Sequence, residues 1–318
     1  MTKLVKIIYD TDIGYDCDDA AALAMLHRLC DRGEAELLAV THCFSTPYVA
    51  GCIDSINCYY GRQVPIGINY ADKRPGDGVY AKVLCEKFTN NYPFENCKTD
   101  KGAADTLSVL RKTLASAEDK SITFVVTGNF SSMARLVKSE SDEFSPLSGK
   151  ELISRKIVRT VIMGGRFFEY WPLRMYHDNR PELGEISWEW NIKDGGLDVD
   201  RTVLNQWPGE LVFASYELGI NIVSLKGIIK KAPENNPVAV AYNVHNKGAG
   251  RFSWDQTAVL EAVRPGEYWD YHEFGKITVG DDLVTRWSFE EGGRHTFLIP
   301  KVKNDDIANL IDELIISG

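Results

Sequence analysis

The sequence contains no apolar run long enough to cross a membrane, no CxxC pair and no excess of positive charge. A membrane span needs about 18 consecutive apolar residues, so we expect a soluble chain with no membrane partner. Seven cysteines, an odd number, in a chain of 318 residues indicate reduced thiols rather than a disulfide framework. A net charge of -9 argues against nucleic acid as a partner, because phosphate binding relies on basic patches.

Leader, linker and repeat signals are also missing. The first residues, MTKLVKIIYD, lack the apolar core and cleavage site of a secretory leader, so we expect a cytoplasmic protein. A hydrophobic fraction of 44% and a charged fraction of 25% are ordinary for a globular protein. We therefore predict a single domain with a large core over residues 1–318.

Short β-branched apolar runs alternate with helical patterns along the chain. The predicted strands are residues 4–9, 36–42, 121–127, 157–165 and 210–216. The predicted helices are residues 18–32, 46–61 with Pro47 at the first position, 103–116, 131–139 and 223–231. This alternation indicates a doubly wound, mostly parallel α/β sheet with helices on both faces, which binds ligands at the carboxyl ends of its strands.

An acidic cluster follows the first predicted strand, where five of the ten residues from Asp10 to Asp19 are aspartates. Like charges at this density repel one another, so the cluster needs a compensating cation or ordered donors. Carboxylate oxygens are suited to a hard divalent cation. The preceding strand and the missing glutamate argue against an EF-hand loop. In the simplest alternative one aspartate caps the helix, another braces the turn and the rest face water.

Two known families have an aspartate motif of this kind after a strand. The sequence superficially resembles phosphatases of the haloacid dehalogenase type in DTD at residues 10–12, in a strand ending at Thr127 and in an acidic pair after Gly280. That family expects threonine or valine where this chain has Gly14. The phosphatase is therefore a distant alternative, in which Asp10 would become phosphorylated.

The second family matches motifs along the whole chain. DTDIGYDCDDAAAL at residues 10–23 resembles the amino-terminal signature of the inosine-uridine nucleoside hydrolase family. Further matches follow in the family's order, and they are FVVTGNFSSMARL (124–136), VIMGG (161–165), EWNI (189–192) and SWDQTAVLEAV (253–263). The resemblance implies the nucleoside hydrolase fold and hydrolysis of the N-glycosidic bond of ribonucleosides, with a role in purine salvage.

The resemblance also implies one bound Ca²⁺ ion. Its ligands would be Asp12, Asp19, the main-chain carbonyl of Thr127 and Asp255, an all-oxygen set that suits calcium. Asp12 would in addition be the general base for the attacking water. Asp255 follows Ser253, which with Gln256 predicts a capping box, so the alternative role of Asp255 is to complement a helix dipole.

The substrate contacts implied by the family fall on four residues. Asp18 resembles the carboxylate that binds the ribose 2'-hydroxyl, but this chain has two extra residues after Gly14, so Asp16 is an alternative. Glu189 and Asn191 resemble the pair that holds the outer hydroxyls of the sugar. The alternative for these two is a surface glutamate and a turn-forming asparagine.

The leaving base has no obvious acid, because Trp254 stands where some family members have a histidine. A tryptophan there can stack on a base, which favours purine nucleosides. Residues 166–187 are predicted to form a loop or lid whose aromatic residues assist, with His177 as the nearby acid. These aromatic residues are Phe167, Phe168, Tyr170, Trp171 and Tyr176. Alternatively, Trp254 is a core residue and the lid aromatics pack the loop down.

Two further expectations come from the resemblance. The family suggests a homo-oligomer, either a dimer or a tetramer. The change at Trp254, and a stretch from Phe44 to Pro47 in place of the asparagine that the family often has beside the ribose, leave a second class open. In that class the chain binds calcium and ribose on the same scaffold without turnover. Within the stretch, Thr46 is interpreted as the cap of the following helix.

Overall fold

The computed structural model describes residues 4–88, 102–171 and 188–316. Its centre is one eleven-stranded sheet with the order β12-β11-β13-β7-β6-β5-β1-β2-β3-β4, and β10 pairs with β13. The strands are β1 (Val5–Thr11), β2 (Ala35–His42), β3 (Ile66–Ile68), β4 (Ala104–Asp105), β5 (Ile122–Val126), β6 (Ile157–Met163), β7 (Leu211–Ala214), β10 (Trp269–Tyr271), β11 (Gly275–Val279), β12 (Thr285–Phe289) and β13 (His295–Pro300). Strands β1 to β7 and β13 are parallel, and β10 to β12 add an antiparallel end.

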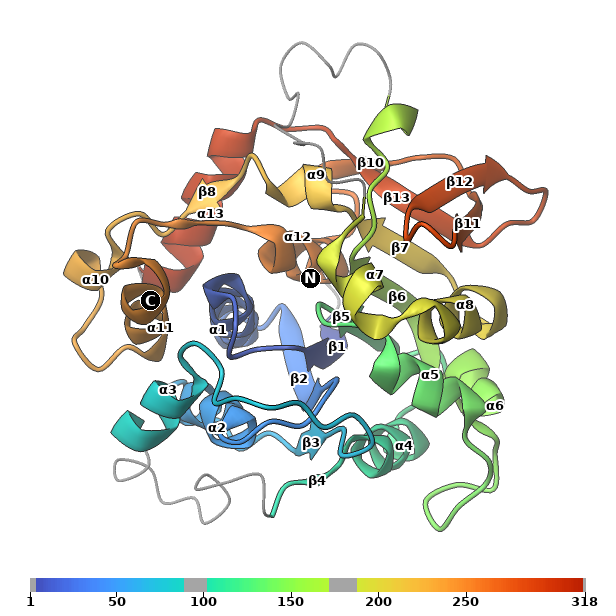
Figure 1. The fold of residues 1–318 in the computed structure, drawn as a ribbon, viewed down its shortest axis with the longest axis horizontal. Coiled ribbons are helices and arrows are strands. Elements are labelled where there is room, and N and C mark those ends of the chain that lie inside the picture. Colours follow the sequence, from blue (N-terminus) through green and yellow to red (C-terminus); the bar gives the residue numbers. More distant parts are fainter. Residues whose placement is uncertain (1–3, 89–101, 172–187, 317–318) are drawn as a thin grey trace.

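Helices cover both faces of the sheet (Figure 1). One layer contains α1 (Cys17–Asp31), α2 (Val49–Tyr59), α11 (Pro237–Asn246), α12 (Trp254–Val263) and α13 (Asn304–Ile316). The other contains α4 (Thr106–Ser116), α5 (Ser131–Lys138), α6 (Gly149–Lys156) and α8 (Leu197–Gln206). The remaining elements are α3 (Ala81–Phe88), α7 (Trp190–Gly195), α9 (Tyr216–Gly219), α10 (Ile228–Lys231), the 3-10 helix η2 (Phe168–Tyr170), and β8 (Val223–Ser224) paired with β9 (Arg251–Phe252).

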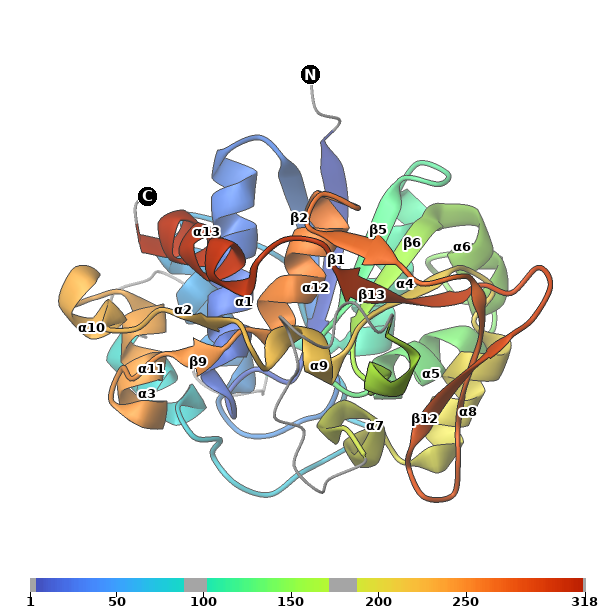
Figure 2. The same cartoon turned by 90° about the horizontal axis from the view of Figure 1, so that it is seen from above.

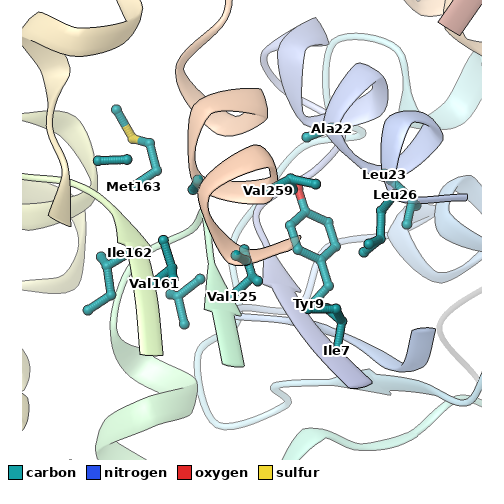
Figure 3. Packing of buried hydrophobic residues seen from close by; sticks show 14 of the residues in the cluster. Ile7, Tyr9, Ala22, Leu23, Leu26, Val125, Val161, Ile162, Met163 and Val259 are labelled. Atoms are coloured by element: carbon teal, nitrogen blue, oxygen red, sulfur yellow. The ribbon is translucent and has the colours of Figure 1, made fainter. Parts of the chain in front are cut away.

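The core lies between the central strands and helices α1 and α12. Every residue of β5 and β7 is buried, which is the pattern of parallel strands covered on both faces. Figure 3 shows Tyr9 of β1 and Val125 of β5 between the sheet and these helices, close to Ala22 and Val259. The hydroxyl of Tyr9 accepts a hydrogen bond from Thr127 Oγ1 at 2.9 Å, so the core reaches directly to the carboxyl end of β5.

The structure confirms the predicted parallel α/β architecture and all five predicted strands, each to within two residues at either end. Three predicted helices are wrong in part. Residues 103–116 form a helix only from Thr106, because residues 104–105 pair with β3 as strand β4. Residues 46–61 form a helix only from Val49, because Tyr48 at the N-cap has a left-handed backbone with φ of 75°. Thr46 is therefore not a helix cap, and its hydroxyl donates to the carbonyl of Pro47. Residues 223–231 divide into strand β8 and the short helix α10.

Two smaller findings concern the exclusions made from the sequence. No helix among the described residues is long and apolar enough to cross a membrane. The cysteines in the same ranges are free thiols, and they are Cys17, Cys30, Cys43, Cys52, Cys58 and Cys85.

Candidate active site

A cavity of about 830 Å³ lies at the carboxyl ends of β1, β5 and β6. The predicted catalytic, substrate and metal residues outside the lid all line it, namely Asp12, Asp16, Asp18, Asp19, Thr127, Glu189, Asn191, Trp254 and Asp255. They come from the β1–α1 loop, the start of α1, the end of β5, the start of α7 and the start of α12. A cavity of this size is within the range of small-molecule sites.

The loop between β1 and α1 is fixed by its own backbone and by a buried tyrosine. Gly14 has φ of 118°, a backbone conformation that residues with a side chain rarely adopt. Its N–H donates to the hydroxyl of Tyr80 at 3.1 Å, and that hydroxyl donates to the carbonyl of Asp16 at 2.8 Å. Asp16 then caps α1 by accepting from the N–H of Cys17 at 2.7 Å. The two extra residues thus lie in a braced loop.

Three buried carboxylates form what we call the acidic floor, which consists of Asp18, Asp19 and Asp255. One oxygen from each lies within 4.8 Å of the others. Thr11 Oγ1 donates to Asp19 at 2.6 Å, and the N–H of Asp255 donates to Asp18 at 3.3 Å. None of the three forms an ion pair with lysine or arginine in the described ranges.

The acidic floor concentrates negative charge that the described side chains do not neutralise. Burial, and then repulsion from neighbouring aspartates, raises the pKa of Asp18, Asp19 and Asp255 well above the usual range. Three buried oxygen donors at this spacing, with no ion pair to a lysine or arginine of the described residues, fit a hard divalent cation in both donor type and charge.

Asp12 borders the acidic floor and is less buried than its three members. Burial raises the pKa of its carboxyl to about 7, with an opposing contribution from a hydrogen bond to Asp19. Asp12 therefore lies beside Asp19 of the floor and lines the same cavity.

Thr127 is held at the end of β5 by hydrogen bonds on both sides. Its N–H donates to the carbonyl of Asp10 at 2.8 Å, and its own carbonyl accepts from Asn191 Nδ2 at 2.8 Å. A carbonyl oxygen has two lone pairs, so the second remains for another partner. Asn191 Nδ2 also reaches the carbonyl of Met163 at 3.1 Å, and therefore joins β5, β6 and α7 at the cavity.

Glu189 is the N-cap of α7 and is almost fully buried. Its carboxylate accepts from the N–H groups of Asn191 at 2.9 Å, Ile192 at 3.2 Å and Gly165 at 3.2 Å. Burial raises its pKa to about 7. The alternative of a surface glutamate and a solvated turn is therefore wrong, because both side chains are buried and organise the backbone around the cavity.

Carboxylates nearer the solvent are compensated by arginines, and we call Asp16, Arg251, Arg74 and Asp194 the paired rim. Arg251 Nε donates to Asp16 at 2.8 Å, and the ion pair holds the pKa of Asp16 below its usual value despite burial. Arg74 pairs with Asp194, and its guanidinium also lies 3.9 Å from the ring centre of Phe44. All of the rim residues line the cavity.

One side of the cavity is an aromatic wall of Tyr216, Phe252 and Trp254. The ring centres of Tyr216 and Trp254 are 5.4 Å apart, and those of Phe252 and Trp254 are 5.1 Å apart. Trp254 Nε1 donates to the carbonyl of Tyr216 at 2.9 Å, and Arg251 lies 5.0 Å from the Trp254 ring centre. Trp254 is thus a partly buried wall residue, in contact with both the core and the cavity.

The capping box predicted before Asp255 is absent. Ser253 is at the N-cap position of α12, but its hydroxyl makes no capping bond and pairs instead with Ser224 Oγ at 2.7 Å. Neither side-chain polar atom of Gln256 has a hydrogen-bond partner in the described residues. The pairing of β8 with β9 brings the two serines together, and this contact competes with the cap.

The described part of the predicted lid, residues 166–171, packs onto the core. Phe167 stacks on Phe297 with ring centres 4.7 Å apart, and Trp171 is buried. None of its aromatic residues lines the cavity, so here the packing alternative is correct. The rest of the predicted lid, with Tyr176 and His177, lies outside the described residues.

Sequence reasoning missed several residues that line the cavity, namely Tyr15, Phe44, Arg74, Asp194, Tyr216, His245 and Arg251. Arg251 and His245 approach the acidic cluster from more than 200 positions away, so no local pattern places them there. The usable signal was that both residues precede the late aspartate motif at residues 253–255 by only a few positions in the sequence.

Comparison with known proteins supports the fold. No family model matches the sequence, and no curated protein matches it at a significant level. Among solved structures, a plant nucleoside hydrolase, PpNRh1, superposes with a TM-score of 0.70 at 14% identity and covers 99% of both chains. A purine-preferring ribonucleoside hydrolase from Gardnerella vaginalis has a TM-score of 0.69 at 15% identity over 98% of both chains.

A third structure, the inosine-uridine preferring nucleoside hydrolase from Bacillus anthracis, gives a TM-score of 0.67 at 17% identity over 99% of this chain and 100% of that one. The chain therefore has the nucleoside hydrolase fold, as a single domain with a mostly parallel central sheet. The resemblance read from the sequence motifs is confirmed at the level of the fold.

Proposed function

We propose that this protein is an N-glycosyl hydrolase that cleaves ribonucleosides to ribose and free base, with calcium in the site. The observation that carries the proposal is the acidic floor, where buried carboxylates that form no ion pair with the described lysines and arginines gather at the carboxyl ends of the strands. The three solved neighbours carry the name nucleoside hydrolase, and this similarity of fold supports the same reaction class.

Calcium would be held by Asp12, Asp19, Asp255 and the free lone pair of the Thr127 carbonyl, with Asp18 directed to the ribose. Bound calcium supplies positive charge that lowers the pKa of nearby water and orients sugar hydroxyls. Asp12 accepts the proton of the water that attacks the anomeric carbon. The carboxylates around the ring stabilise the positive charge that develops on the sugar.

Glu189 and Asn191 act mainly on the shape of the sugar subsite, because their hydrogen bonds fix the β5, β6 and α7 backbone around it. Their remaining acceptor lone pairs are available to the outer hydroxyls. The aromatic wall offers flat surfaces for a base, which favours the larger purine ring. By family resemblance, we also propose that the protein is a homo-oligomer and that it is located in the cytoplasm. Light scattering would measure the size of the oligomer.

The test is incubation with purine and pyrimidine nucleosides and measurement of free ribose. Asp12→Asn keeps an oxygen ligand but loses the base, so kcat should fall by ~100-fold or more with little change in melting temperature. Ribose binding without release of any base from the unmodified protein would instead support the non-catalytic class. Full turnover in Asp12→Asn would assign the base to another carboxylate.

A further inference from the structure

The proposed reaction leaves a nitrogen of the base with the electron pair of the broken bond, and this nitrogen needs a proton. Resting on the proposed function, we infer that His245 is a catalytic residue that donates this proton. Among the histidines in the described ranges, His245 alone lines the cavity. It comes from the last turn of α11, an element that the sequence motifs do not include.

The charges around His245 suit a proton donor. Its Nε2 lies 3.6 Å from an oxygen of Asp16, close enough for charge attraction but too far for a hydrogen bond that would hold the proton. Asp16 and the carboxyl end of the helix attract a positively charged ring, and Arg251, which pairs with Asp16, opposes it. The thiol of Cys17 also lies nearby. Nδ1 has no hydrogen-bond partner among the described residues, so no acceptor fixes the ring in one tautomer.

The position of His245 also matches the expected position of the base. Asp16 lies next to His245 and also forms an ion pair with Arg251. The guanidinium of Arg251 in turn lies over the Trp254 ring, so His245 and the aromatic wall share one side of the cavity. The sugar subsite is at the acidic floor. Asp255 belongs to this floor, and the preceding residue, Trp254, belongs to the aromatic wall, so the two lie next to each other. A ribonucleoside with its sugar on the floor therefore directs its base toward this wall and His245.

Other groups in the described chain are poorer donors. Burial lowers the pKa of His27, His42 and His295 to about 4, and none of them lines the cavity. Tyr15 and Tyr216 do line it, but burial raises the pKa of both phenols above the usual value, which weakens them as acids at neutral pH.

The bond between C1' of the ribose and the base nitrogen breaks, and its electron pair goes to that nitrogen. The nitrogen takes the proton from Nε2 of the His245 imidazolium, and the ring becomes neutral. The oxygen of water forms the new bond to C1', and Asp12 accepts the water proton. Asp12 then releases a proton to solvent and His245 takes one up, so the net change is nucleoside plus water to ribose plus base.

The experiment compares two substrates that differ in their need for an acid. Inosine has a poor leaving group, whereas p-nitrophenyl riboside releases an anion that is stable without protonation. His245→Gln should lower kcat on inosine by ~100-fold or more and on p-nitrophenyl riboside by less than about 3-fold. His272→Gln is the matched control, because this histidine lies outside the cavity, and both of its rates should stay at the unmodified level.

Each result is decisive. Equal losses on both substrates, or an unchanged rate on inosine, would overturn the role of His245 while leaving the proposed function in place. If the unmodified protein hydrolyses neither substrate, the proposed function fails and the inference falls with it. Melting temperatures verify folding, and His245→Asn provides a second variant if His245→Gln does not fold.

Discussion

The acidic floor and the paired rim contain the same residue type in two different electrostatic states. In the rim, the arginines beside Asp16 and Asp194 supply the missing charge. In the floor, no arginine or lysine of the described chain forms an ion pair with Asp18, Asp19 or Asp255, and their pKa values are raised. The protein thus pairs the carboxylates of the rim with its own arginines, whereas in the proposed function the carboxylates of the floor are paired by a bound cation.

Removal of one carboxylate from the acidic floor should have the largest effect on calcium binding and on turnover. The unmodified protein should bind about one calcium per chain. Asp255→Ala should lose this calcium, and kcat should fall by at least ~1000-fold, because the charge stabilisation that the cation supplies is worth several kcal/mol. Elemental analysis and ribose release measure the two effects.

The rim variant Asp194→Asn is the matched control for calcium, since it removes a carboxylate that is already paired with Arg74. It should keep about one calcium per chain. Unmodified protein that carries no calcium, or zinc in its place, would contradict the site as described.

A second comparison separates two aspartates that lie two positions apart. Asp18 is buried in the floor, whereas Asp16 is partly exposed and paired with Arg251. Asp18→Asn should lower kcat/KM by ~10- to 100-fold, the range for a lost hydrogen bond to a charged group. Asp16→Asn should lower it by less than about 5-fold, because a partly exposed ion pair contributes little. The reverse order would place the ribose contact on Asp16.

A third variant tests whether the aromatic wall receives the base. Trp254→Ala should lower kcat on purine nucleosides by ~10-fold, the magnitude of one lost stacking contact, and should affect uridine less. Calcium content should not change, because the ligand side chain of Asp255 remains. Equal losses on purines and uridine, or a uridine preference in the unmodified protein, would contradict a stacking role.

The smallest effect concerns stability, at a buried carboxyl outside the cavity. Asp200 is fully buried, neither of its oxygens has a hydrogen-bond partner in the described chain, and burial raises its pKa to about 8. A raised pKa in the folded state means that the stability contribution is complete at low pH and is lost as the pH rises through 8. We therefore expect a proton, rather than a cation, to neutralise Asp200 at neutral pH.

In Asp200→Asn this pH dependence should disappear. The melting temperature of the variant minus that of the unmodified protein should therefore rise from pH 5 to pH 9. Asp198→Asn, at an exposed position on the same helix, is the control and should change the melting temperature equally at both pH values. A parallel shift in Asp200→Asn would show that Asp200 is ionised at pH 5.

Much of the fold was predictable because its signals are local. Strands such as β5 are continuous apolar runs, and the acidic motif stands directly after β1. The rim was not predictable, because Arg251 and Asp16 are 235 positions apart and only the folded chain brings them together. The strands after residue 268 were missed for other reasons. β11 and β12 are partly exposed and lack a continuous buried apolar run, whereas β13 is fully buried but begins with the polar residues His295 and Thr296.

The last elements of the chain have a consequence for the order of folding. Strand β13 lies between β11 and β7, and α13 packs beside α1, the helix that carries Asp18 and Asp19 (Figure 2). At synthesis rates of about 5–20 residues per second, α13 leaves the ribosome roughly 15–60 s after α1. Helix α1 is therefore synthesised well before the helix that later covers it. During that interval, the side of α1 that contacts α13 lacks this partner, next to the acidic motif.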